Sequence, residues 1–318
     1  MSKPLKILVI RLSSIGDIVL TTPVVRCLKK QLNAEVHFLT KAPFECILAN
    51  NPYVDKIHFL KDGEAPLQFE KFDWVIDLHH NLRTKKVKNA LGVPTKSFHK
   101  LNIEKWLLTT FKINRLPEKH IVDRYLETVE HLGVKKDGGG LDYFLTDADG
   151  VSTAEYEMAE KKGYVAVVIG GQHATKILPT EKLIAVCEKV NKPIFLIGGK
   201  EDVERGEIIA SAVSNTYNMC GKFSINQSAY LIQQAESVIT HDTGMMHIAA
   251  AFHKKIYSVW GNTVPEFGMY PYLADSASKM IEVKGLSCRP CSKIGYKKCP
   301  KGHFKCMNDI DVNLFAQE

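Results

Sequence analysis

Short runs rich in Val and Ile alternate with segments of helical period along most of this chain, and this alternation restricts the fold more than any other feature. The candidate strands cover residues 6–10, 35–40, 56–60 and 74–78 in the first half, and 165–169, 194–197, 238–240 and 256–259 in the second. Apolar strands separated by helices are typical of parallel sheets that are covered on both faces. The sequence therefore predicts an α/β protein with two doubly wound, Rossmann-like domains facing a central cleft.

Helical patterns fill the gaps between these strands. We expect helices at residues 17–32, 44–50, 83–91, 103–111, 123–132, 153–162, 180–190, 203–213, 225–235 and 245–252. The stretch KKDGGGLDYFLTDADG, residues 135–150, has four glycines and four aspartates and is the best candidate for a linker. We therefore place the domains at residues 1–145 and 146–318.

The apolar runs are too short for a membrane-spanning helix, and the first residues lack the apolar core of a signal peptide. We therefore expect a cytoplasmic protein. The formal net charge is +7, and the window from Arg83 to Lys119 holds ten basic residues against two acids. Such a window needs an anionic partner, for which nucleic acid, anionic lipid and a phosphorylated substrate are all candidates.

Part of this window, KLNIEKWLLTTFKINR, combines apolar and basic residues in one helical segment. Ile103, Trp106, Leu107 and Phe111 recur at helical spacing, with the basic residues outside that set. Two interpretations stay open: a helix packed on the core, and a helix that lies at a membrane surface.

In open α/β sheets, ligands bind beyond the carboxyl ends of the strands, so the loops that follow strands are the ones to search. The first, RLSSIGDIVLTTP, has neither the dinucleotide fingerprint nor a P-loop. Gly16 lets a ligand approach the backbone there, and Asp17 is an ionised carboxylate that could accept a proton. The alternative is that Asp17 only complements the dipole of the following helix.

Three further loops, in the second half, contain glycine next to polar residues. Lys176 follows Gly170–Gly171 in the first, and Glu201 follows a second Gly-Gly turn, where an acid often holds ribose hydroxyls. In the third, THDTGMMHIAAA, the helix start at Thr243 and Gly244 would bind an anion, flanked by Asp242 and His247. A solvated lysine, first-turn acids and a plain helix cap are the respective alternatives. Together the three turns suit a nucleotide diphosphate.

In order along the chain, LSSIGDIVLTTPVVRCLK, DLHHNLRT, GGQHATKILP, IGGKED and HDTGMMHIAAA resemble motifs of glycosyltransferase family 9, the lipopolysaccharide heptosyltransferases and their relatives. The resemblance implies a GT-B fold and an inverting transfer that requires no metal. It implies that Asp17 is the general base and that Ser13, Ser14, Gly16 and Arg83 contact the acceptor. It also implies that the donor is bound by Lys176, Glu201, Asp242, Thr243, Gly244 and His247.

The same resemblance implies an ADP-heptose donor and a phosphorylated, lipid A-type acceptor of the lipopolysaccharide core. It therefore places the protein peripherally on the inner face of the inner membrane. Nucleic-acid binding could also explain the basic window, but no recognised nucleic-acid-binding motif accompanies it, so we expect no nucleic-acid partner. A non-catalytic two-domain protein that binds a sugar or a nucleotide sugar is the alternative; transfer of the sugar by purified protein discriminates between the two.

Cysteine is concentrated near the C-terminus. Four of the eight, Cys288, Cys291, Cys299 and Cys306 (the tail cysteines), have the spacing Cys-x₂-Cys-x₇-Cys-x₆-Cys. The first Cys-x₂-Cys suits a zinc knuckle, whereas the later gaps are looser than in a standard zinc finger. A structural zinc site and a free-thiol or disulfide state both stay open.

Overall fold

The computed structural model describes residues 3–61, 67 and 69–316, and the chain divides into two compact units. Unit 1 comprises Met1–Lys100 and Lys119–Thr146, and unit 2 comprises Leu101–Glu118 and Asp147–Glu318. The segment Leu101–Glu118 thus packs with unit 2, although the sequence analysis assigned it to the first domain. The reason is local: Leu108 packs against Val264 and Phe267.

Unit 1 is built on a parallel sheet, which has five strands in the order β3-β2-β1-β4-β5 among the described residues. These strands are β1 (Lys6–Ile10), β2 (Glu35–Thr40), β3 (Lys56–Phe59), β4 (Trp74–Asp77) and β5 (Thr95–Ser97). The chain runs outward from β1 to β3 and then returns to the other side of β1 with β4. The point at which the strand order reverses therefore lies between β1 and β4.

The helices of unit 1 begin and end at residues that explain their bounds. They are α1 (Ile15–Val19), α2 (Thr22–Leu32), α3 (Leu82–Leu91) and α5 (Ile121–Leu126), with 3₁₀ turns at Ala42–Ile47 and Glu130–Leu132. We expected one helix over 17–32, but Pro23 lies in the first turn of a second helix, where its missing N–H costs nothing. Asn81 caps α3 by accepting from the Thr84 amide, and Gly92 ends it with a positive φ.

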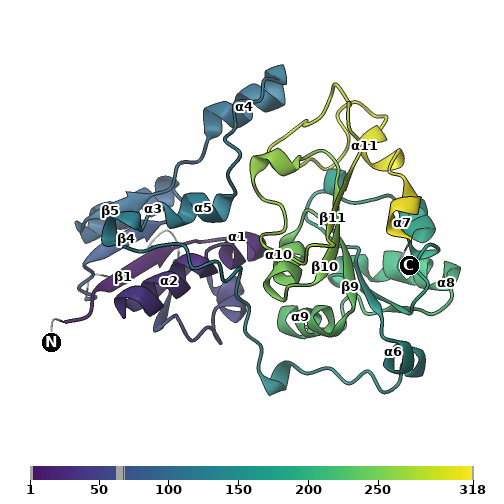
Figure 1. The fold of residues 1–318 in the computed structure, drawn as a ribbon, viewed down its shortest axis with the longest axis horizontal. Coiled ribbons are helices and arrows are strands. Elements are labelled where there is room, and N and C mark those ends of the chain that lie inside the picture. Colours follow the sequence, from purple (N-terminus) through teal and green to yellow (C-terminus); the bar gives the residue numbers. More distant parts are fainter. Residues whose placement is uncertain (1–2, 62–66, 68, 317–318) are drawn as a thin grey trace. The chain divides into compact units, whose positions relative to one another are not determined.

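Unit 2 is built on a second parallel sheet, six-stranded among the described residues, in the order β11-β10-β9-β6-β7-β8. The strands are β6 (Val165–Val168), β7 (Ile194–Ile197), β8 (Thr216–Asn218), β9 (Ser237–His241), β10 (Lys255–Trp260) and β11 (Lys279–Glu282). The order reverses between β6 and β9. Helices cover both faces, with α9 and α10 on one side of the sheet and α7 and α8 on the other (Figure 1).

Most helices of unit 2 follow the predicted ranges, but the one expected over 153–162 begins at Glu157, and the one at 305–308 was not predicted. The helices of this unit are α4 (Asn102–Phe111), α6 (Glu157–Lys162), α7 (Thr180–Cys187), α8 (Val203–Ala212), α9 (Ile225–Gln234), α10 (Gly244–Ala251) and α11 (Lys305–Asn308), with 3₁₀ turns at Asp147–Asp149, Ala174–Lys176, Lys200–Asp202, Pro265–Phe267 and Val312–Phe315. Ser224 caps α9 by accepting from the Gln227 amide.

Each unit has its own apolar core. In unit 2 the C-terminal segment contributes to that core, because Cys306, Met307, Ile310 and Phe315 are buried in it. This packing joins residues 306–315 to unit 2. Within the described residues, none of the helices has the length and apolar character needed to cross a bilayer.

Candidate active site

The polar loops of unit 2 gather where the strand order reverses. The loop after β6 carries Lys176, and the loop after β9 carries Asp242. Since β6 and β9 are neighbours in the sheet, their carboxyl ends meet at one edge. This is where doubly wound sheets bind their ligands.

Lys176 and Asp242, 66 positions apart in the sequence, form the central ion pair of this edge. Lys176 Nζ lies 2.5 Å from Asp242 Oδ2, and both side chains are largely buried. Asp242 Oδ2 also accepts a hydrogen bond of 2.8 Å from the Thr263 hydroxyl, which follows β10. Loops from three strands are thus joined around one carboxylate, which holds the lysine ammonium at the sheet edge.

The start of α10 lies beside this pair. Thr243 is the N-cap residue, but its side chain makes no capping hydrogen bond, so the helix start lacks the side-chain cap that the sequence suggested. Gly244 is the first helical residue, and His247 is buried one turn later. A helix start of this kind suits an anion, because its backbone N–H groups and the helix dipole favour negative charge.

The two Gly-Gly turns have distinct roles. A Cβ added at Gly171 would lie 3.3 Å from Thr243, so this glycine lets the loop after β6 approach the start of α10 closely. In the second turn it is Asp202, not Glu201, that is buried: its carboxylate accepts from the Gly199 amide at 2.9 Å. Glu201 is exposed in the 3₁₀ turn that precedes α8.

Two buried polar side chains at this edge were not found from the sequence. His241, the last residue of β9, accepts a hydrogen bond from the Leu178 amide at its Nε2, and burial and then the charge of Arg205 lower its pKa to about 3. Asn262, just after β10, is buried, and neither amide atom has a hydrogen-bond partner among the described residues. The backbone of Asn262 belongs to the same site, because its N–H donates a hydrogen bond to the Thr175 carbonyl. The sequence signal was weak: a polar residue after a strand.

In unit 1 the corresponding edge lies between β1 and β4. Asp17 Oδ1 pairs with Arg11 Nη2 at 2.6 Å, and its Oδ2 accepts from the Ser14 hydroxyl at 2.8 Å. Arg11 in turn donates to the Leu78 carbonyl, just after β4. Burial lowers the pKa of Arg11, but Asp17 and other nearby groups raise it above its ordinary value overall. The Asp17 side chain keeps 21% of its surface exposed, so a substrate hydroxyl can reach it.

The other residues that the sequence analysis expected to contact an acceptor lie at or near this edge. Ser13, Ser14 and Gly16 form the loop and first turn around Asp17, whereas Arg83 is exposed in the first turn of α3. His79 was missed: burial, then the charges of Arg11 and Lys100, lower its pKa to about 4.

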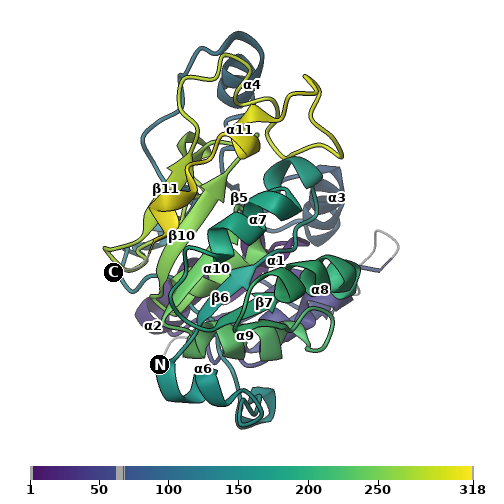
Figure 2. The ribbon, with the colours of Figure 1, turned by 90° about the vertical axis from the view of Figure 1, so that its right-hand side faces the viewer.

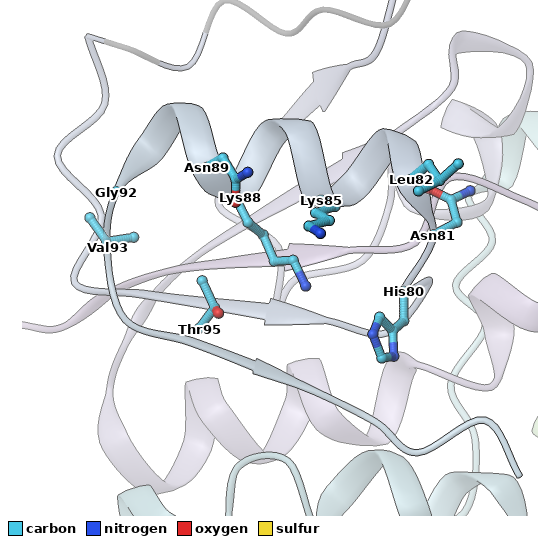
Figure 3. A pocket seen from close by; sticks show the side chains of 9 residues that line it. All are labelled: His80, Asn81, Leu82, Lys85, Lys88, Asn89, Gly92, Val93 and Thr95. Atoms are coloured by element: carbon cyan, nitrogen blue, oxygen red, sulfur yellow. The ribbon is translucent and has the colours of Figure 1, made fainter.

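An open pocket of 770 Å³ runs along α3 (Figure 3). Lys85 and Lys88 line it from the helix, His80 from the loop after β4 and Thr95 from β5, whereas Arg83 is not among its lining residues. Lys88 Nζ is paired with Asp77 at 2.9 Å. The pocket is basic and lies next to the carboxyl end of β4.

In the part of the chain that the structure describes, no three ligand atoms of the tail cysteines and neighbouring side chains lie within 4.8 Å of one another. Cys288 Sγ lies 3.8 Å from His303 Nε2, while burial and then neighbouring thiols raise the pKa of Cys306 to about 12. Among the described residues, the one group with three ligand atoms within 4.8 Å of one another is His37, His58 and Glu70 in unit 1. There Glu70 is ion-paired with two lysines (Lys6 and Lys56), which already neutralise it. The zinc site at the tail cysteines stays a prediction.

Two parallel, doubly wound sheets, each with polar loops where its strand order reverses, define the class of proteins built from paired Rossmann-like units. The model of glycosyltransferase family 9 (heptosyltransferase) matches residues 65–300. The chain therefore belongs to this family and is a glycosyltransferase with a GT-B fold, as the sequence motifs predicted.

Individual relatives are distant. Lipopolysaccharide heptosyltransferase 1 of Campylobacter coli is 24% identical over 81% of this chain and 84% of its own length. The structure of Escherichia coli ADP-heptose lps heptosyltransferase II superposes with a TM-score of 0.67 at 18% identity, covering 98% of this chain and 99% of that chain. A family 9 glycosyl transferase from Veillonella parvula gives a TM-score of 0.68 at 22% identity, covering 86% and 85%.

Proposed function

We propose that this protein transfers a heptose from ADP-heptose to a phosphorylated, lipid A-type acceptor of the lipopolysaccharide core, with inversion at the anomeric carbon and without a metal cofactor. The observation that carries this proposal is the Lys176–Asp242 ion pair beside the start of α10. The pair and the helix start together offer an ammonium group and backbone amides to a diphosphate. The relatives named for this transfer support the choice of sugar.

In the proposed reaction, Asp17 takes the proton of the acceptor hydroxyl. The hydroxyl oxygen attacks the anomeric carbon from the face opposite the diphosphate, the bond from that carbon to the diphosphate oxygen breaks, and ADP leaves. Lys176 and the first amides of α10 stabilise the negative charge that grows on the leaving group. Asp242 holds the lysine in place, Glu201 contacts the ribose, and Thr243, Gly244 and His247 surround the diphosphate and sugar.

The acceptor side of the proposal rests on unit 1. Ser13, Ser14 and Gly16 would shape the loop around Asp17, and Arg83 would contact an anionic group of the acceptor. The pocket beside α3 adds Lys85 to this basic surface. A lipid-linked acceptor would place the protein peripherally on the cytoplasmic face of the inner membrane.

A panel of ADP-, UDP- and GDP-sugars tests the donor assignment by thermal unfolding. A ligand at about 100 times its Kd stabilises the folded state by about 2.7 kcal/mol, so ADP-heptose should raise the midpoint while the other sugars do not. Asp242→Ala should abolish this shift. A shift with a UDP-sugar and none with an ADP-sugar would overturn the donor assignment. Donor binding without transfer to any acceptor would favour the non-catalytic alternative.

A further inference from the structure

Helix α4 has its apolar face on the outside. Ile103, Trp106 and Phe111 have exposed fractions of 71%, 51% and 56%, and they share one face of the helix because they are three and eight residues apart. Ile113, just after the helix, is exposed as well. A helix at the surface of a soluble protein normally buries such a face against the core.

The opposite face of α4 is the one that packs on unit 2. Leu108 is buried there against Val264 and Phe267, together with half-buried Glu104 and Lys105. Lys105 Nζ lies 6.0 Å from the centre of the Phe267 ring. The charged side of the helix is thus turned inward and its apolar side outward. The sequence left open whether the apolar side chains of this helix pack on the core. For Ile103, Trp106 and Phe111, that interpretation is wrong.

A lysine-rich segment adjoins this helix. Lys112, which follows α4, donates to the Pro290 carbonyl at 2.7 Å and so ties the helix end to residues 283–308. That segment contains seven Lys and Arg residues and no Asp or Glu. Six of the seven are exposed, and none of these six forms an ion pair within the described part of the chain: Lys284, Lys293, Lys297, Lys298, Lys301 and Lys305. Figures 1 and 2 show both elements at the same end of unit 2.

The segment contributes exposed apolar side chains too. Ile294 and Tyr296 lie among these lysines and are exposed. Exposed aromatic and aliphatic side chains surrounded by cations are the composition that binds the headgroup region of an anionic bilayer. We propose that α4 and residues 283–308 form one docking surface, through which the protein binds an anionic phospholipid membrane and inserts Trp106 and Phe111.

A lipid-linked acceptor lies in such a membrane, so this docking surface would bring the protein to its acceptor. That purpose rests on the proposed function. Its test does not depend on the acceptor. Vesicles of phosphatidylglycerol and phosphatidylethanolamine, with no glycolipid, should sediment the full-length protein at low salt, and phosphatidylcholine vesicles should not. Raised salt should weaken binding, because it screens the lysines.

Two variants separate the apolar and charged contributions. Ile103→Ser/Trp106→Ser/Phe111→Ser and Lys293→Gln/Lys297→Gln/Lys298→Gln/Lys301→Gln should each weaken vesicle binding at least about a hundredfold. The matched control is Ile208→Ser/Met280→Ser, which removes apolar side chains of similar exposure, 52% and 51%, elsewhere in unit 2. The control should bind like the wild type.

Tryptophan fluorescence locates the inserted side chain. Trp106 is exposed, whereas Trp260 is buried and Trp74 is packed against His131, so brominated lipid should quench Trp106. Trp106→Phe should bind vesicles but lose most of the quenching.

Wild-type protein that does not bind anionic vesicles, or an apolar variant that binds them normally, would overturn the proposal. Concentration-dependent self-association lost in the apolar variant, without vesicle binding, would instead assign the face to a second copy of the chain. Transfer to a water-soluble acceptor fragment, measured in parallel, reports on the proposed function separately.

Discussion

Replacing Asn262 by alanine separates a functional amide from a structural one. The side chain is 1% exposed, and neither its nitrogen nor its oxygen has a partner among the described residues. Leaving a buried polar group unpaired costs about 1–3 kcal/mol, and the alanine variant removes that cost. It also opens a small cavity, which costs about 1 kcal/mol. We therefore expect the unfolding free energy of Asn262→Ala to stay the same or to rise by up to about 2 kcal/mol.

Donor affinity should change in the opposite direction. If the amide is retained at the sheet edge because it binds the donor, its loss removes one or two hydrogen bonds, each worth about 0.5–1.5 kcal/mol. The Kd for ADP-heptose should then rise about tenfold. Urea unfolding and calorimetric titration on the same preparation measure both quantities.

Asn51 provides the matched control. It is buried in unit 1, and its Oδ1 accepts a hydrogen bond of 2.9 Å from the Tyr53 amide. Asn51→Ala should therefore lower the unfolding free energy by about 1–2 kcal/mol and leave the Kd for the donor unchanged. The reasoning fails if Asn262→Ala is destabilised as much as Asn51→Ala while it binds the donor normally.

Three further predictions concern other parts of the chain. Asp17→Asn should lower turnover about a hundredfold or more and leave donor affinity unchanged. The control Asp137→Asn also removes a carboxylate from a buried arginine, but it should keep its turnover. Near-normal turnover of Asp17→Asn would show that Asp17 is not the base. Because the pKa of His241 is about 3 when folded and about 6.5 when unfolded, the unfolded state takes up a proton first as pH falls. Stability should thus decrease below pH ~6.5, by about 2 kcal/mol at pH ~5 from this residue, and urea unfolding of His241→Leu should lack that part of the decrease. Finally, protein purified without chelator should contain about one zinc per chain if the tail cysteines bind it; zinc far below that, with four freely titrating thiols, would contradict the tail site.

The central strands could be predicted from the sequence because burial on both faces demands unbroken Val and Ile. Three edge strands could not: β5, β8 and β11 have the sequences TKS, TYN and KMIE. An edge strand meets a neighbour on one side alone and is partly solvated, so it needs no apolar run. Backbone pairing, which no side-chain pattern reveals, defines these three strands.

The location of the site was predictable for the same topological reason, but its internal contacts were not. Residues that follow parallel strands must gather at one edge, and this placed Lys176 and Asp242 among the candidates. Which of them would meet depends on strand order, since β9 pairs with β6 and not with β8, its predecessor in the chain. The same limit applies to Asn262, because the lack of a hydrogen-bond partner can be seen only in the folded structure.

Helix α4 shows a different limit of pattern analysis. The spacing of Ile103, Trp106 and Phe111 identifies an apolar face, but it carries no information about which surroundings that face meets. Here two contacts orient the helix. Leu108 packs against Val264 and Phe267 on the other side of the helix, and Lys112, beyond its end, donates a hydrogen bond to the Pro290 carbonyl. Because the exposed face contributes little to folding, each single serine substitution at these positions should leave the unfolding free energy within about 0.5 kcal/mol of the wild type. A larger loss would mean that the face is covered by protein, whatever the vesicles show.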